Sequence, residues 1–200
     1  MRSIVSYSYG CLLARFGEPL AGAIRSWGST IPDDRIFNNE EGDMGREDKP
    51  HVTVKYGLHT SDVDEVMSKL SGWPPFQVTL GRTSVFHNED CIVLKLGVEG
   101  RDLINLNRYV SKVFEVTDTH PTYNPHATIA YLVKDDEDPY YYQEYFTDNF
   151  EGMIVDIDEL EFSTASGDKF TIPLEGTDMN MQAMQLLGMA RDIIGENNAI

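Results

Sequence analysis

The sequence predicts an α+β fold of two similar lobes, and three observations lead to that prediction. A Pro-His-apolar-Thr-apolar-x-Tyr pattern occurs twice, at residues 50–56 and 125–131. Its period-two alternation is typical of a β-strand, whose successive side chains point to opposite faces. From the first copy to the second, the order of patterns is mirrored: strand, helix, strand, then strand, helix, strand. We therefore expect a bilobal, pseudo-two-fold arrangement of antiparallel sheets around a central cleft, with the helices outside.

The part of the chain before the first copy predicts a strand, a helix and a loop. Residues 4–13 are apolar and rich in tyrosine, which indicates a first strand. Residues 18–26 place apolar side chains at helical spacing. Residues 31–49 are polar and contain several Pro, Gly, Asp and Asn residues, so we expect a long loop there.

Between the two copies the patterns are more regular. Thr60 and Ser61 are expected to cap a helix whose apolar residues recur at i, i+3, i+4 and i+7. The expected elements that follow are strands at 76–86 and 91–98 joined by a turn, a helix at 102–115, and a loop at 117–125.

After the second copy, the acidic run 135–138 is expected to be a solvated turn and not a metal site. It has the composition of a loop or of a helix N-terminus, where acidic side chains suit the helix dipole. A tyrosine-rich helix at 139–150, a strand at 154–163 and a strand at 170–174 complete the expected domain, residues 1–175. Residues 176–200 carry a stripe of apolar side chains and predict an amphipathic tail helix. We expect it to pack on the domain or on a second copy of the chain, forming a homo-oligomer.

Composition restricts the class of protein and of ligand. Two hundred residues suit one domain, and the two cysteines make no disulfide framework, which favours a reducing compartment. The sequence shows neither a signal peptide nor a membrane-spanning stretch, so we expect a cytoplasmic protein. Its net charge of −17 would repel duplex DNA or long RNA. A small phosphorylated ligand remains compatible, since it needs only a few local donors.

The duplicated pattern predicts a two-histidine site. In an uninterrupted strand, His51, Thr53 and Lys55 share one face, as do His126 and Thr128. The alternate residues, which include the tyrosine of each copy, would then point into a core. The other three histidines have no such company, and we expect ordinary structural roles for them: His59, His87 and His120.

Paired imidazoles suit phosphodiester chemistry, because an unperturbed histidine titrates near 6.5 and serves as acid or base at neutral pH. Each threonine hydroxyl, about one β-repeat from its histidine, would donate to a phosphate oxygen, and Lys55 would add positive charge. Zinc prefers three or four His, Cys or carboxylate ligands, whereas these strands offer two His and two Thr. We therefore expect no metal and no cofactor.

These residues resemble a known family. The duplicated pattern is similar to that of the two-histidine (2H) phosphoesterases, which carry a His-x-Thr/Ser motif on each of two pseudo-symmetric lobes. Three further stretches resemble the phage anti-CBASS enzymes, viral proteins that degrade the cyclic oligonucleotide signals of bacterial immunity. They are Ser-Tyr-Gly-Cys at 8–11, Ile-Pro-Asp-Asp at 31–34, and Gly-Arg-Glu at 45–47 leading into the first copy.

The resemblance implies metal-independent cleavage of 3′–5′ bonds in cyclic di- and trinucleotides, in a host bacterial cytoplasm. It implies an acid–base role for both histidines and phosphate binding by Thr53 and Thr128. Such sites also stack a base on an aromatic residue and recognise one with a late acidic residue. Our candidates are Tyr9 for stacking and Glu161 for base recognition, with Trp73 as a further stacking candidate.

Three alternatives stay open. A relative of the same superfamily would act on RNA ends that carry a 2′,3′-cyclic phosphate. A nucleotide sponge would bind a signal without cutting it, although it would not need a matched proton donor and acceptor. An accessory protein would act through its tail helix, in which case deletion of residues 176–200 would abolish its function.

Overall fold

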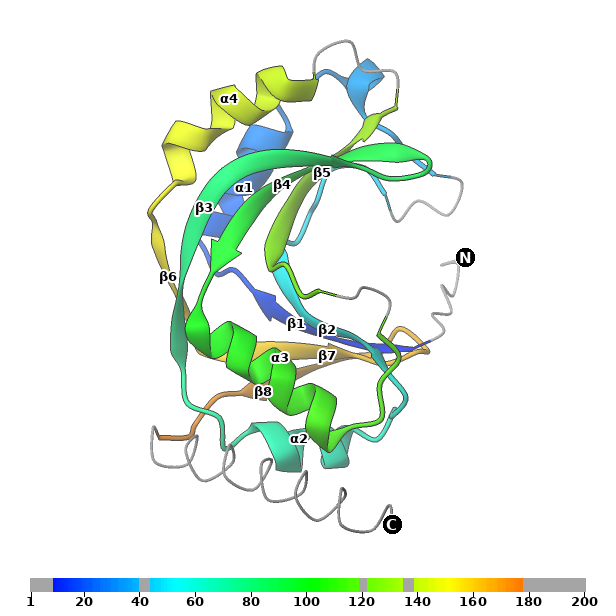
Figure 1. Cartoon of the computed structure of the whole chain (residues 1–200), viewed down its shortest axis with the longest axis vertical. Helices are drawn as coiled ribbons and strands as arrows, with labels where there is room; N and C mark the ends of the chain where they lie inside the picture. Colours follow the sequence, from blue (N-terminus) through cyan, green and yellow to red (C-terminus); the bar gives the residue numbers. More distant parts are fainter. Residues whose placement is uncertain (1–8, 40–43, 119–121, 135–138, 178–200) are drawn as a thin grey trace.

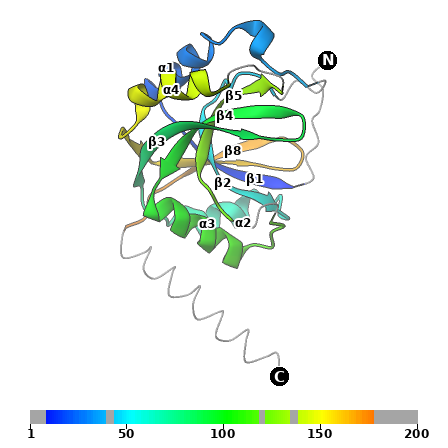
Figure 2. The same ribbon diagram turned by 45° about the horizontal axis from the view of Figure 1, so that its top comes forward.

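Two four-stranded antiparallel sheets form the centre of the computed structural model, which describes residues 9–39, 44–118, 122–134 and 139–177. The first sheet has the order β2-β1-β7-β8 and the second the order β5-β4-β3-β6. Figures 1 and 2 show the helices on the outside, with α1 and α4 on one side of the molecule and α2 and α3 on the other. This is the α+β, two-lobed fold that the sequence predicts.

The strands and helices follow the chain in an order close to the expected one. The strands are β1 (Gly10–Arg15), β2 (His51–Leu58), β3 (Phe76–His87), β4 (Cys91–Glu99), β5 (His126–Val133), β6 (Ile154–Ile157), β7 (Glu159–Ser163) and β8 (Lys169–Pro173). The helices are α1 (Leu20–Gly28), α2 (Val63–Leu70), α3 (Arg101–Val113) and α4 (Pro139–Phe150), with a short 3-10 turn at Asp33–Arg35. None of the described helices is long and apolar enough to cross a membrane.

Three expectations about individual elements are corrected. The continuous strand expected at 154–163 is two strands, which separate at Asp158 and join different sheets. The cap of α2 is Asp62, whose carboxylate accepts a hydrogen bond from the Glu65 amide at 3.1 Å. The first strand, β1, ends at Arg15 instead of Leu13. Residues 1–8, the acidic run 135–138 and residues 178–200 lie outside the described residues, so the predicted tail helix stays a prediction.

The mirrored sequence order does not divide the molecule at the central turn. β3 pairs with β4 across the expected turn, and both strands lie in the second sheet. β1 and the late strands β7 and β8 complete the first sheet. Each lobe therefore combines segments that are distant in the sequence.

Each sheet is partly covered by helices and loops that follow strands of the other sheet in the chain. Helix α1 follows β1 of the first sheet in the chain and packs against β5, while α3 follows β4 of the second sheet and packs against β2. The loop before β2 also pairs with the outer edge of β5, through Phe37 N to Tyr131 O (2.9 Å) and Glu47 N to Ile129 O (2.9 Å). The loop before β5 pairs with β2 in the same way. Neither histidine strand has an open edge along these segments, which protects it from pairing with another chain.

The contact of the second loop with β2 is closest at Gly57. Thr117 N donates to Gly57 O at 2.9 Å, and a β-carbon on Gly57 would overlap the Thr117 carbonyl oxygen. Gly57 also has φ +93°, a conformation that L-residues with a side chain rarely adopt. Gly152 has a similar φ of +83° but open space around the position of its missing β-carbon.

A comparison of alanine substitutions at these two glycines distinguishes the cost of backbone strain from the cost of steric overlap. We expect Gly152→Ala to lower the free energy of unfolding by about 1–3 kcal/mol, the cost of a left-handed backbone. Gly57→Ala should cost about 1–3 kcal/mol more, because the loop must also move. Urea unfolding of both variants measures the difference, and equal losses would contradict the close contact with Thr117.

Candidate active site

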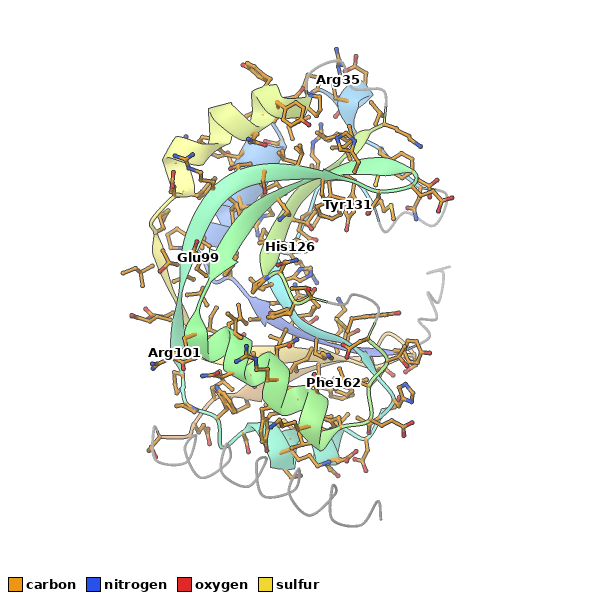
Figure 3. All side chains as sticks on the ribbon, viewed as in Figure 1. Arg35, Glu99, Arg101, His126, Tyr131 and Phe162 are labelled. Carbon is orange, nitrogen blue, oxygen red and sulfur yellow. The ribbon has the colours of Figure 1, made fainter. Side chains whose placement is uncertain are left out.

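The two histidine strands meet between the sheets. β2 and β5 are each the edge strand of their sheet, and they lie against one another. His51 is the first residue of β2 and His126 the first of β5. Figure 3 shows His126 near the centre of the molecule, with Tyr131 farther along the same strand.

Both imidazole rings are held in the same way. His51 Nδ1 lies 2.9 Å from the carbonyl oxygen of Lys49, and His126 Nδ1 lies 2.8 Å from that of Asn124. Since a carbonyl only accepts, these contacts assign the ring proton to Nδ1 in the neutral form. The Nε2 atom of each ring is then the one that accepts a proton, and it is the atom that would exchange protons with a substrate.

The backbone repeats this correspondence. The carbonyl of Pro50 accepts a hydrogen bond from Phe16 N, and that of Pro125 accepts one from Val98 N, both at 3.1 Å. His51 pairs in register with Arg15, and His126 with Gly97. The two copies of the motif are therefore equivalent in three dimensions as well as in sequence.

Thr53 and Thr128 lie on the same strand faces as their histidines. Both are half-buried, and no hydrogen bond within the described residues engages either hydroxyl. Each hydroxyl is therefore available as a donor to a bound phosphate.

A β-bulge follows the threonine in both strands and corrects the expected alternation. Thr53 pairs with Leu13 but Lys55 pairs with Leu12, so Val54 is the extra residue, and Ile129 is its counterpart in β5. A bulge puts two residues opposite one and shifts the phase of the strand. The residue after each bulge is buried, and the tyrosine after that is half-buried instead of lying in the core.

The bulge also removes Lys55 from the face of His51. Its side chain is 8% exposed and its ammonium group is paired with the carboxylate of Asp118. Asp118 lies in the loop that covers the edge of β2, so this ion pair joins loop to strand. The position of Lys55 does not support the predicted role in charge stabilisation.

Glu161 lies on the histidine face of the first sheet, in register with Leu13. Arg15 donates two hydrogen bonds to its carboxylate, at 2.6 and 2.5 Å, and Lys169 lies 3.5 Å from it. Burial alone would raise the pKa of this carboxyl, but Arg15 and Lys169 hold the pKa below its ordinary value. Glu161 is therefore an ionised, oriented acceptor beside the predicted site.

Tyr9 belongs to an aromatic group at the far end of β2. Its ring stacks on His59, with centroids 5.1 Å apart, and meets Tyr56 edge-on at 6.1 Å. Tyr56 is five residues along the strand from His51, roughly 16 Å for an extended chain. Tyr9 is half-buried.

Trp73 is wrongly expected to stack on a base. Its side chain is fully buried, and its ring packs on Tyr109, with centroids 5.3 Å apart. A side chain with no exposed surface cannot contact a ligand in this conformation, so Trp73 belongs to the core.

Four neighbours of the histidines are missing from the sequence-based site. A carboxylate oxygen of Glu47 lies 3.8 Å from His51 Nδ1, and the Phe86 ring meets His126 edge-on at 5.8 Å. Arg15 and Lys95 face the two motifs from the adjacent strands. In the sequence, the alternation within β4 is the only signal that Lys95 lies on a strand face. The sequence does not show which strand pairs with β4, so it does not place Lys95 beside Thr128. Among the described residues, no three His, Cys, Asp or Glu side chains gather as a metal-binding group.

The Arg15–Glu161 pair generates a pH prediction. A carboxyl whose pKa is lowered in the folded state contributes stability above its ordinary pKa, and this is lost as the pH falls through the folded pKa. We expect Glu161→Gln to lower the free energy of unfolding at pH 7 by about 1–2 kcal/mol and to flatten its decline below about pH 4.5. The exposed Glu159 of the same strand supplies the control, Glu159→Gln. Parallel pH curves for both variants would contradict this role.

Comparison with solved structures places the fold. LigT from E. coli, in a structure with NADP⁺, aligns with 84% of this chain and 95% of its own, at 19% identity and a TM-score of 0.50. A second LigT structure, with 3′-AMP, aligns at 20% identity over 84% and 96% of the chains, with a TM-score of 0.47. A structure described as a phosphoesterase aligns at 16% identity over 84% and 95%, with a TM-score of 0.49. No curated protein matches the chain.

A family model decides the relationship at the level of sequence. The model of the 2′-5′ RNA ligase superfamily matches residues 38–169, which is more than half of the chain and includes both histidine motifs. Together with the LigT-like fold, this match shows that the chain belongs to the 2′-5′ RNA ligase superfamily, whose members are two-histidine phosphoesterases.

Proposed function

We propose that this protein is a metal-independent phosphodiesterase that cleaves the 3′–5′ bonds of cyclic di- and trinucleotides by two-histidine acid–base catalysis. One observation carries the catalytic part. Both Nδ1 atoms are held by a backbone carbonyl two residues earlier, so both Nε2 atoms are the proton-exchanging positions. A site with only one such ring would bind a phosphate but would lack the second proton transfer.

The proposed reaction is a single displacement at phosphorus. One neutral imidazole takes a proton from the attacking hydroxyl, of water or of a neighbouring ribose, as the new P–O bond forms. The other, protonated, gives a proton to the leaving ribose oxygen as the old P–O bond breaks. Each transfer is worth roughly 10²–10⁴-fold in rate. The hydroxyls of Thr53 and Thr128 donate to the non-bridging oxygens.

The proposed substrate class rests on charge and on the resemblance to the anti-CBASS enzymes. A net charge of −17 disfavours a long polyanion and is compatible with a small nucleotide. Glu161, ionised and fixed by Arg15, is suited to accept hydrogen bonds from the amino or imino groups of a base. Tyr9 and its aromatic neighbours offer π-faces at the end of β2. In this proposal a phage uses the enzyme in the host cytoplasm to evade CBASS defence.

A second candidate is the cleavage of 2′,3′-cyclic phosphate at RNA ends. The family assignment favours it, because the description of the superfamily names RNA as a substrate. The same two histidines would serve, and only a short RNA tail would need to enter the site. A non-hydrolytic sponge remains the third outcome to be tested.

The decisive experiment compares substrates in the presence of EDTA. The full chain is incubated with a panel of cyclic di- and trinucleotides and, separately, with RNA ending in 2′,3′-cyclic phosphate, and products are identified by mass spectrometry. Loss of a cyclic oligonucleotide supports the proposal. Turnover of RNA ends alone supports the second candidate, and recovery of intact, bound cyclic nucleotide supports the sponge. Activity that EDTA abolishes would overturn the metal-independent mechanism.

The histidines generate the first mutational prediction. We expect His51→Ala and His126→Ala each to lower kcat by about 10²–10⁴-fold, since each removes one proton transfer. His87, exposed at the end of β3, provides the matched control, and His87→Ala should retain full activity. Steady-state kinetics on the accepted substrate measures this. If one histidine variant kept wild-type kcat, paired acid–base catalysis would be excluded.

The threonines generate the second mutational prediction. Thr53→Val and Thr128→Val keep the shape of the side chain but remove the hydroxyl, so we expect kcat/KM to fall by roughly 10-fold or more. Thr53→Ser and Thr128→Ser keep the donor and should retain most activity. Equal losses in the valine and serine variants would show that the methyl group, and not the hydroxyl, is needed.

A further inference from the structure

Lys95 occupies a distinctive position on β4 of the second sheet. It pairs in register with Thr128 on one side and with Ser84 on the other. Residues directly opposite one another in antiparallel strands point to the same face, with β-carbons about 4.5–5.5 Å apart. The side chain of Lys95 therefore rises from the same face as the Thr128 hydroxyl and the His126 ring.

An aromatic ring lies beside its ammonium group. Lys95 Nζ lies 5.8 Å from the centroid of the Phe86 ring, and that ring also touches His126. Lys95 is half-buried, and within the described part of the chain no carboxylate lies at ion-pair distance from it. Burial lowers its pKa, and no neighbouring charge contributes to the shift.

Two other cations beside the motifs, unlike Lys95, have carboxylate partners. Arg15 is paired with Glu161, and Lys55 with Asp118. Placing an ammonium group in a partly desolvated position without a counter-ion costs stability. A bound anion would supply the missing partner and offset that cost.

We propose that Lys95 binds the phosphate of the substrate together with Thr128. This inference rests on the proposed function, since it assumes that a phosphodiester lies between the two histidines. A compact ammonium, fixed before the substrate arrives, stabilises the negative charge that grows on the non-bridging oxygens in the transition state.

In this proposal the positive charge on the phosphate comes from the second sheet. In the first sheet, the residue in register with Thr53 is the apolar Leu13, where the second sheet has Lys95. The two halves are thus equivalent in their His and Thr residues and different in their cation. Lys95 breaks the pseudo-symmetry and orients the phosphate toward the second sheet.

The test uses Lys95→Met, Lys95→Arg and, as control, Lys134→Met. Lys134 is exposed and donates to the Glu89 carbonyl oxygen at 2.7 Å, at the far end of β5 from His126. We expect kcat/KM of Lys95→Met to fall about 10²–10³-fold on whichever phosphodiester the wild type cleaves. Lys95→Arg should recover part of this loss, and Lys134→Met should match the wild type.

A second readout does not depend on turnover. Inorganic phosphate should raise the Tm of the wild-type protein and leave that of Lys95→Met unchanged. Without phosphate, Lys95→Met should have the higher Tm, because an unpaired, partly buried charge has been removed. If Lys95 had only a structural role, Lys95→Met would have a lower Tm than the wild type, and phosphate would raise the Tm of both proteins equally.

The outcomes separate this inference from the proposed function. If phosphate stabilises the wild type but not Lys95→Met while no cyclic oligonucleotide is cut, the phosphate site stands and the proposed substrate is wrong. If cyclic oligonucleotides are cut equally well by Lys95→Met, or phosphate stabilises both proteins equally, Lys95 does not bind the phosphate. Failure of phosphate to stabilise the wild type also overturns the inference.

Discussion

The exchange of helices and loops between the two sheets is the constraint on which the rest of the structure depends. The helix that follows a strand of one sheet packs on the other sheet: α1 packs on β5 and α3 on β2. Each loop that leads into one histidine strand also pairs with the outer edge of the other. Buried residues of both sheets belong to one hydrophobic core. The lobes are therefore not independent bodies, and the relative position of the two histidines is fixed by the same contacts that stabilise the fold.

This arrangement gives the site its symmetry and leaves room for asymmetry. The backbone around the two motifs repeats in detail: the carbonyl two residues before each histidine holds its Nδ1 atom, and a bulge of one residue follows each threonine. The side chains from the neighbouring strands do not repeat. The first sheet contributes a neutralised Arg15–Glu161 pair, and the second contributes Lys95 beside an aromatic ring. The duplicated histidine–threonine frame thus carries two different sets of neighbouring side chains, which the proposed function assigns to a base and to a phosphate.

The same division makes the proposed phosphorylated ligand compatible with an acidic protein. The net charge of −17 acts at long range, where salt screens it within about 8 Å at physiological ionic strength. Binding is decided by the few donors that face the ligand at close range. In the proposed site these are two hydroxyls and one ammonium, placed where solvent competes less strongly than at the surface.

The sequence by itself determined the two strands that carry His51 and His126, most helix and strand positions, and the fold class. It could do so because alternation and helical spacing are local properties of the chain. The tertiary structure alone decided which strands pair, and so placed β3 in the second sheet and split the strand expected at 154–163. It also decided that the bulge in β2 turns Lys55 away from the face of His51 and that Trp73 is completely buried. Both features depend on neighbours that are distant in the chain. Lys95 became visible for the same reason: only strand pairing sets it opposite Thr128.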